Sequence, residues 1–365
     1  MDVNTILSDP RRRNLAILAA VALVSLLLAI GAVWQEADEG LPAYKPQQFF
    51  RGFARDVRNA AHIHIASKTG AFDVVFVPEK GWVVPQRGDY PASFDLVQRT
   101  LVGFAALQTI EPKTARPELF DLVGLDPPPR GNGVAITVSD DKGRELAALV
   151  AGKSEDIGDP SGATGLFVRR PNENQAWLVR AVFEPRPAIS DWLSKQVLNL
   201  DRARIQEVDF DPAGGTTPFV VTRARPSEPD FKVLPVPAGK PAPDAGVADS
   251  VASALTEFGF DDVRPAHELD FANTALTARA VTKTFDGLKV TVNVQKAGPD
   301  YWATVSAEAF GPGDSAREAI QINAHASGWA YKLPAFKGQL FMTTLDSLLK
   351  APAPGAGLPP GMAPQ

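Results

Sequence analysis

Apolar side chains in much of this 365-residue chain recur at every second position, a spacing that predicts half-buried β-strands. The expected strands cover residues 62–65, 72–77, 81–84, 134–138, 145–151, 166–169 and 176–180. Helical spacing appears at 93–107, where Ser93 suits an N-cap, at 117–123 before Gly124, and at 189–197. A further short helix is expected within 49–59.

The same order of elements recurs in the second half of the chain. The repeat has strands at 207–210, 218–224, 231–234, 276–284, 288–295, 301–307 and 328–334, and helices at 247–258 and 338–350. We therefore expect an α+β fold of two tandem, similar domains, each a mostly antiparallel sheet with packed helices. The first domain would span 56–205 and the second, a diverged repeat, 206–350.

An unbroken apolar run from Leu15 to Trp34 has no polar face, and as a helix it would be about 30 Å long, the thickness of the bilayer core. It predicts a transmembrane helix whose partner is the lipid bilayer. Because Arg11, Arg12 and Arg13 precede it, residues 1–14 should be a cytoplasmic tail. Residues 35–55 would be a linker to periplasmic domains of a single-pass protein of the bacterial inner membrane. A cleaved signal peptide is the alternative.

Composition narrows the possible partners and chemistry. The net charge is −5, so the chain offers no basic surface for nucleic acid, and no nucleic-acid partner is expected. Cysteine is absent, which excludes disulfides, thiolate metal sites and cysteine nucleophiles. Six prolines between Pro226 and Pro243 predict a long loop, and residues 351–365 predict a disordered tail.

Only weak candidates for chemistry stand out. His62 and His64 would share one face of a strand and could hold a metal with Asp73 or His267, although unpaired surface histidines are the commoner case. His325 shows no ligand spacing. The acidic pairs Asp140-Asp141, Asp156 with Asp159, and Asp261-Asp262 lie in polar turns and fit turn or cap roles.

Residues 147–154 end like a phosphate-binding loop, but its first glycine is replaced by Ala147 and no helix is expected after Ser154. We therefore expect a strand followed by a turn there. The sequence assigns no catalytic, cofactor-binding or metal-binding residues, and no cofactor.

Residues 118–201 carry an ordered set of short motifs. They are Leu122-Val123-Gly124-Leu125-Asp126-Pro127-Pro128, Val134-Ala135-Ile136-Thr137-Val138, Leu149-Val150-Ala151-Gly152-Lys153, Gly165-Leu166-Phe167-Val168-Arg169, Ala176-Trp177-Leu178-Val179, and a closing segment with Trp192, Leu193 and Leu198. In this order and spacing they resemble the bacterial family known as domain of unknown function 4340. The second half lacks the Gly-Leu-Asp-Pro motif.

The resemblance implies an accessory subunit of an ABC-type transport system, because the genes of the family accompany components of such systems. It implies no catalytic residues. We therefore expect a non-enzymatic interaction subunit that contacts protein partners by strand addition or through the face between the two repeats. A polysaccharide- or lipid-binding module is the alternative, and a hydrolase is a further one.

Overall fold

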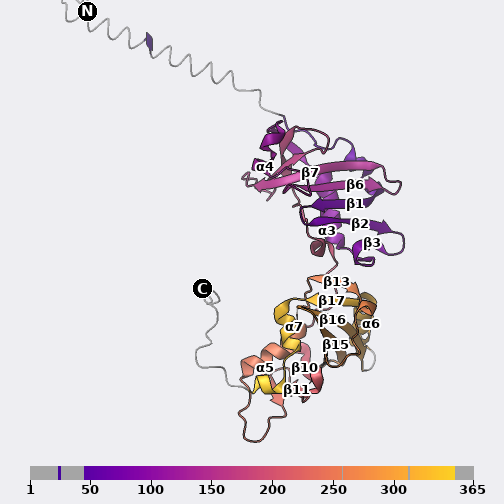
Figure 1. The fold of residues 1–365 in the computed structure, drawn as a ribbon, viewed down its shortest axis with the longest axis vertical. Coiled ribbons are helices and arrows are strands. Elements are labelled where there is room, and N and C mark those ends of the chain that lie inside the picture. Colours follow the sequence, from indigo (N-terminus) through magenta and orange to yellow (C-terminus); the bar gives the residue numbers. More distant parts are fainter. Residues whose placement is uncertain (1–23, 26–44, 257, 311–312, 350–365) are drawn as a thin grey trace, which may run out of the picture.

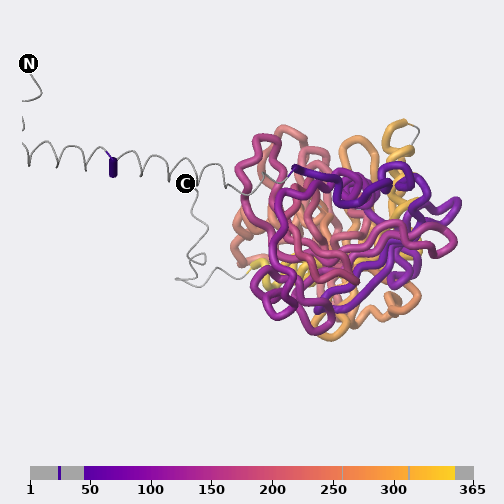
Figure 2. Tube along the Cα trace, turned by 90° about the horizontal axis from the view of Figure 1, so that it is seen from above, coloured from indigo at the N-terminus to yellow at the C-terminus, as the bar shows by residue number. Residues whose placement is uncertain are grey.

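The computed structural model describes residues 24–25, 45–256, 258–310 and 313–349. All of the described strands belong to two large antiparallel sheets, one from each half of the chain. Figure 1 shows the first sheet above the second along the long axis of the molecule. Viewed from above in Figure 2, the first half overlies the second.

The first sheet has nine strands in the order β4-β3-β2-β1-β6-β7-β8-β9-β5. The strands are β1 (Ala60–Ser67), β2 (Gly70–Val77), β3 (Gly81–Val84), β4 (Tyr90–Pro91), β5 (Gln108–Pro112), β6 (Val134–Asp140), β7 (Glu145–Glu155), β8 (Thr164–Arg169) and β9 (Ala176–Ala181). Alternate side chains of the central strands are buried, as the period of two predicts for a sheet with one face on the core.

The second sheet has eight strands in the order β12-β11-β10-β14-β15-β16-β17-β13. They are β10 (Ile205–Asp211), β11 (Phe219–Thr222), β12 (Lys232–Leu234), β13 (Asp262–Pro265), β14 (Thr277–Thr284), β15 (Leu288–Ala297), β16 (Asp300–Ala309) and β17 (Trp329–Leu333). Apart from β4, this order matches the first sheet strand for strand. The two halves therefore share one topology. The exact domain boundaries stay a prediction.

Few helices accompany the sheets. They are α2 (Phe53–Asp56), α3 (Phe94–Ala106), α4 (Phe120–Val123), α5 (Ala245–Ala252), α6 (Asp314–Ala326), α7 (Ala335–Phe341) and α8 (Leu345–Leu348). Ser93 accepts a hydrogen bond from the amide of Leu96, so it caps α3 as the sequence predicted. Gly124 ends α4 in the left-handed conformation.

The predicted α+β class with a transmembrane helix is wrong, because the described chain is mostly antiparallel sheet with few helices. The segment expected as a helix at 189–197 forms only a 3-10 turn, η5 (Ile189–Trp192), before an extended stretch. Leu193 continues into a bridge with Ala92, beside β4. The backbone of residues 192–194 therefore forms hydrogen bonds with the chain at β4 in place of the hydrogen bonds of a helix.

The membrane prediction is corrected as well. Within the described ranges, no helix is long and apolar enough to cross a bilayer, so the predicted single-pass inner-membrane topology is not supported. Except for residues 24 and 25, the predicted span from Leu15 to Trp34 lies outside the described residues. The predicted tails, 1–14 and 351–365, also lie outside them.

Helix α6 was not predicted, and it covers part of a sheet edge. Strand β17 pairs with β16 only at residues 301–303. Beyond that point, the side chain of Asn323 on α6 accepts a hydrogen bond from the amide of Ala307 at 2.8 Å and donates one to its carbonyl at 2.7 Å. An amide side chain thus replaces the missing strand.

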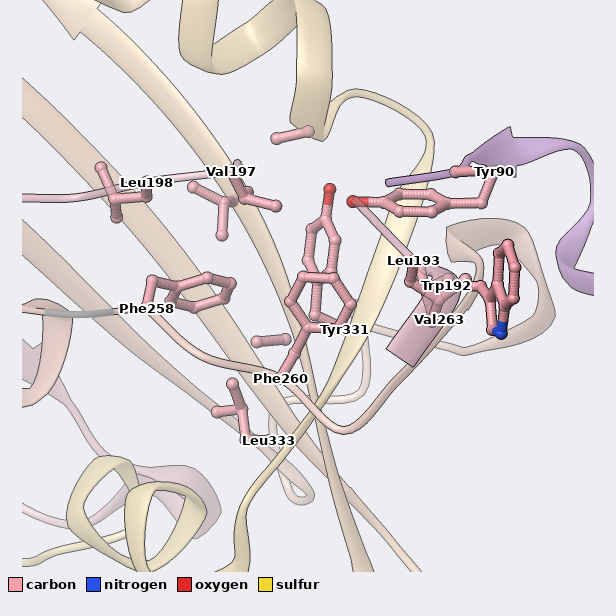
Figure 3. Packing of buried hydrophobic residues seen from close by; sticks show 14 of the residues in the cluster. Tyr90, Trp192, Leu193, Val197, Leu198, Phe258, Phe260, Val263, Tyr331 and Leu333 are labelled. Carbon is pink, nitrogen blue, oxygen red and sulfur yellow. The ribbon is translucent and has the colours of Figure 1, made fainter. Parts of the chain in front are cut away.

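An aromatic cluster joins the two halves (Figure 3). Tyr90 of β4 is 2% exposed, and its ring centre lies 5.0 Å from that of Trp329 and 6.2 Å from that of Tyr331. Phe260, which precedes β13, lies 4.9 Å from Tyr331 and 6.1 Å from Tyr90. The core therefore continues from one sheet into the other. We call this contact the junction.

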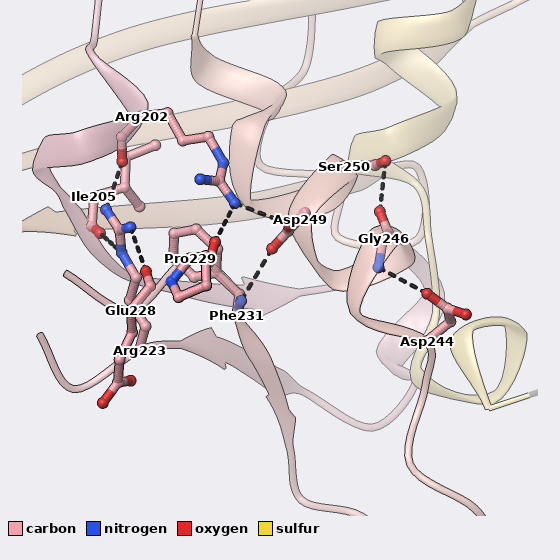
Figure 4. A network of polar contacts seen from close by, with 10 residues as sticks. All are labelled: Arg202, Ile205, Arg223, Glu228, Pro229, Phe231, Asp244, Gly246, Asp249 and Ser250. Atoms are coloured by element: carbon pink, nitrogen blue, oxygen red, sulfur yellow. Dashed lines mark hydrogen bonds and ion pairs between the residues drawn. The ribbon is translucent and has the colours of Figure 1, made fainter. Parts of the chain in front are cut away.

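The proline-rich stretch predicted as a loop is anchored by buried arginine (Figure 4). Arg223, 3% exposed, donates to the carbonyls of Ile205 and Glu228 at 2.9 and 3.0 Å. Arg202 donates to the Pro229 carbonyl at 2.7 Å and pairs with Asp249 of α5. The irregular backbone leaves some carbonyl groups without a backbone donor, and the guanidinium groups supply the missing hydrogen bonds.

Candidate functional site

The two histidines singled out in the sequence lie on the outer face of the first sheet and share one carboxylate. Asp73 Oδ1 lies 2.9 Å from His62 Nε2 and 2.7 Å from His64 Nδ1. Strand register explains this, since His64 is directly opposite Asp73 on β2. His62 is directly opposite Ser139 on β6, whose hydroxyl lies 3.4 Å from His62 Nδ1.

The side chain of Gln86 completes this histidine cluster, which consists of His62, His64, Asp73, Gln86 and Ser139. Gln86 lies in η3 (Pro85–Arg87), donates to Asp73 Oδ2 at 2.7 Å and accepts a hydrogen bond from the Asp73 amide. Burial raises the pKa of Asp73, but hydrogen bonds from His64, Gln86 and His62 outweigh it and hold the pKa below its usual value.

The geometry of the cluster fixes which ring nitrogens carry hydrogen. An ionised carboxylate only accepts hydrogen bonds, so His62 Nε2 and His64 Nδ1 must both carry hydrogen. In the part of the chain described, no group of three histidine or acidic side chains is arranged to hold a metal ion. The carboxylate oxygen bonds both rings directly, and His267, the other suggested ligand, lies apart in η9 (Ala266–Glu268).

The acidic pairs lie in turns or in ion pairs. Asp140 accepts hydrogen bonds from the amides of Arg144 and Lys142, which lower its pKa. Asp159 binds Arg180 and Ser161, which also lower its pKa. Both shifts are opposite to the raised pKa of a general acid. Asp156 accepts from the amide of Gly158.

The segment that resembles a phosphate-binding loop is part of a continuous strand, β7, which runs on to Glu155. Its glycine has a packing role instead. A Cβ atom on Gly152 would lie 2.2 Å from the carbonyl oxygen of Val123, so only glycine lets α4 approach the strand. Lys153 donates to the carbonyl of Leu122 at 2.8 Å.

Residues 117–133, which we call the cover segment, lie on the outer face of the first sheet. They contain the Gly-Leu-Asp-Pro motif. Phe120 and Leu125 bury their side chains against Val150 and Ala176, forming a second small core. Arg169, 6% exposed, donates to the carbonyl of Leu125 at 3.3 Å. The motif that carries the family resemblance therefore covers the sheet.

Two neighbouring hollows lie along the connection between the two halves. One hollow of about 500 Å³ is bounded by the start of α3, the ends of β8 and β9 and the following chain, and a second, of about 400 Å³, lies between residues 195–199 and α6. Lys195 lines both hollows. We call them together the linker groove. The sequence reasoning missed it, since its lining comes from segments far apart in the chain.

Lys195 fixes one wall of the linker groove. Its ammonium group donates to the carbonyl of Phe260 at 2.8 Å and lies 4.0 Å from the centre of that ring. Burial lowers the pKa of Lys195, although the carboxylates of Asp261 and Asp191 oppose the shift. The groove is thereby attached to the aromatic junction.

The sheet edges offer little for strand addition. Residues 47–49 pair with the edge strand β5, and residues 192–194 pair with the chain at β4. Strand β12 has three residues, begins with Lys232 and is followed by Pro235, all features that oppose edge pairing. Strand β13 faces Arg87 of the first half. Among the described residues, the sheet edges are thus largely covered.

Comparison with known proteins adds one match. Residues 82–276 match the family model described as domain of unknown function (DUF4340), from β3 through β13 and thus across both sheets. No curated protein and no solved structure matches the chain. The match covers more than half of the 365 residues and includes the cover segment and the first hollow of the linker groove, whereas the α6 wall of the second hollow lies beyond it. This chain belongs to the DUF4340 family.

Proposed function

We propose that this protein is a non-enzymatic interaction subunit of an ABC-type transport system, and that its linker groove holds an extended segment of a partner protein. The observation that carries the proposal is the groove itself, whose two hollows lie on either side of Lys195. The assignment to transport rests on the family, whose genes accompany such systems.

The lining of the groove supports an extended peptide as the occupant. In the second hollow, Gln196, Asn199 and Gln321 supply amide groups that can both donate and accept, as a peptide backbone requires. In the first hollow, Val182 and Leu96 add apolar contact beside charged groups. Such a mixture of polar and apolar lining is typical of protein-protein contacts.

Co-purification with the transporter proteins encoded beside the gene tests the proposal. The double variant Val182→Arg with Gln321→Arg places one bulky charge in each hollow. The matched control, Val102→Arg with Ala324→Arg, adds the same charge at exposed positions of α3 and α6 that do not line the groove. We expect recovery of the partner to fall about tenfold with the groove variant only.

Equal losses in the two variants would show that the groove has no special part in binding. If the parent chain recovers no transporter component at all, the assignment to transport is wrong. Circular dichroism of each variant checks that the loss does not come from unfolding.

The same lining gives some support to a second candidate, a polysaccharide. Hydroxyl groups of a sugar chain bind well to carboxylates and amides, and Glu184, Asp191 and Gln321 present them in the groove. Titration calorimetry with acidic and neutral oligosaccharides tests this candidate. Binding that survives the groove variant would place the sugar elsewhere.

A further inference from the structure

A chain of hydrogen bonds leads from the histidine cluster to the junction. Asp73 binds Gln86 through both its carboxylate and its amide. The carbonyl of Gln86 accepts a hydrogen bond from Arg87 Nη1 at 3.1 Å. Arg87 then donates to both carboxylate oxygens of Asp262 on β13, at 2.5 and 2.9 Å.

This chain ends where the two halves pack together. A Cβ atom on Gly88 would lie 3.1 Å from the side chain of Pro265, at the end of β13, so the turn after Arg87 touches the second half directly. Tyr90 follows and packs on Trp329. The residues from Gln86 to Tyr90 therefore connect the face of the first sheet to the second sheet.

Few other charged groups neighbour the two histidines. On β2 the carboxylate of Asp73 faces both rings. On β6, Ser139 and Thr137 lie opposite them, and Asp140 next to Ser139 is paired with Arg144. Beyond η3, Asp89 is paired with Lys80. The charge of the cluster is thus set mainly by its two histidines and Asp73.

We propose that the histidine cluster is a proton-sensitive device that loosens the junction in acid. With neutral imidazoles the cluster carries one negative charge, that of Asp73. Protonation of both His62 and His64 changes it to one positive charge. Positive charge beside Gln86 repels the Arg87 guanidinium and weakens its pair with Asp262. Acid thereby shifts the junction toward a looser contact between the two halves.

The absence of cysteine makes a direct test simple, because a pair of spin labels can be added without background. Lys142→Cys in the first half and Lys296→Cys in the second are exposed positions. Pulsed distance measurements on the full chain at pH 8 and pH 5.5 should show one narrow distance that broadens and lengthens in acid. This readout needs no partner, so it stands apart from the test of the linker groove.

Variants assign the effect to the cluster. His62→Gln with His64→Gln should keep the narrow distance at both pH values, whereas His267→Gln with His325→Gln, the other two histidines, should behave as the parent does. Arg87→Gln should show the broad distance at both pH values. A parent distance that does not change with pH, or a shift that persists without His62 and His64, would overturn the proposal. Circular dichroism at both pH values verifies that each variant is folded during the distance measurements.

Discussion

Arg169 of β8 lies beneath Phe120 of the cover segment, with its guanidinium carbon 5.0 Å from the ring centre. The same guanidinium donates to the carbonyl of Pro171 at 2.9 Å and, more weakly, to those of Arg170 and Leu125. One buried cation thus holds the cover segment on the sheet. This packing gives the family motif a structural role.

Replacing that cation should destabilise the protein. Arg169→Met keeps much of the packing volume but leaves buried carbonyl groups without donors, so we expect a loss of about 2 kcal/mol in the free energy of unfolding. Urea denaturation followed by tryptophan fluorescence measures it. The control, Arg58→Met, changes an exposed arginine and should cost less than about 0.5 kcal/mol. Equal costs would contradict the anchoring role.

Gly152 should not tolerate a methyl group. Gly152→Ala would put Cβ against the Val123 carbonyl, so α4 must shift, at a cost of about 1–3 kcal/mol. Gly246→Ala is the matched control, because a Cβ there meets nothing closer than 3.4 Å and alanine favours the helix α5. Thermal unfolding should separate the two variants clearly. A neutral Gly152→Ala variant would mean that the cover segment is not closely packed.

The packing of the junction should be lost at high pH, when its buried tyrosines ionise. Burial raises the pKa of Tyr90 to about 12 and also raises that of Tyr331. Because the folded pKa is raised, the stabilisation is complete below the unfolded pKa of about 10 and is lost as pH rises through the folded pKa. A spectroscopic titration should show these two of the four tyrosines ionising only with unfolding. Tyr90→Phe should leave only Tyr331 in that late step, whereas early ionisation of all tyrosines would show an open junction.

Asp73 should make the stability of the protein fall in acid, whereas the two tyrosines make it fall in alkali. Its folded pKa is lowered, so its contribution is present above the unfolded value near 3.8 and is lost as pH falls through the folded value. Asp73→Asn removes this contribution. Denaturation curves of parent and variant should therefore differ at pH 6 and converge near pH 2, and parallel pH dependences would contradict the prediction.

Much of the fold was readable from local patterns. The alternation around Ile63 and Ile65 predicted β1, and Ser93 and Gly124 marked helix ends that the structure has. The strands β5 and β13 were missed, because their few residues carry little alternation and become strands only by pairing with β9 and β17. Three of the five members of the histidine cluster were named from the sequence: His62 and His64, which are two residues apart, and Asp73. Ser139 reaches it through the register of β6 with β1, and Gln86 reaches it from η3 by its hydrogen bonds with Asp73.

By itself, the sequence determined most of the strands, the repeated order of elements and the family, since a period of two and a run of motifs are properties of the chain alone. Tertiary structure decided the scarcity of helix, the junction and the linker groove. Arg87 and Asp262 are 175 residues apart, and no local pattern encodes their meeting. Their contact forms only when both sheets are folded and packed against each other, which depends on core residues throughout the chain.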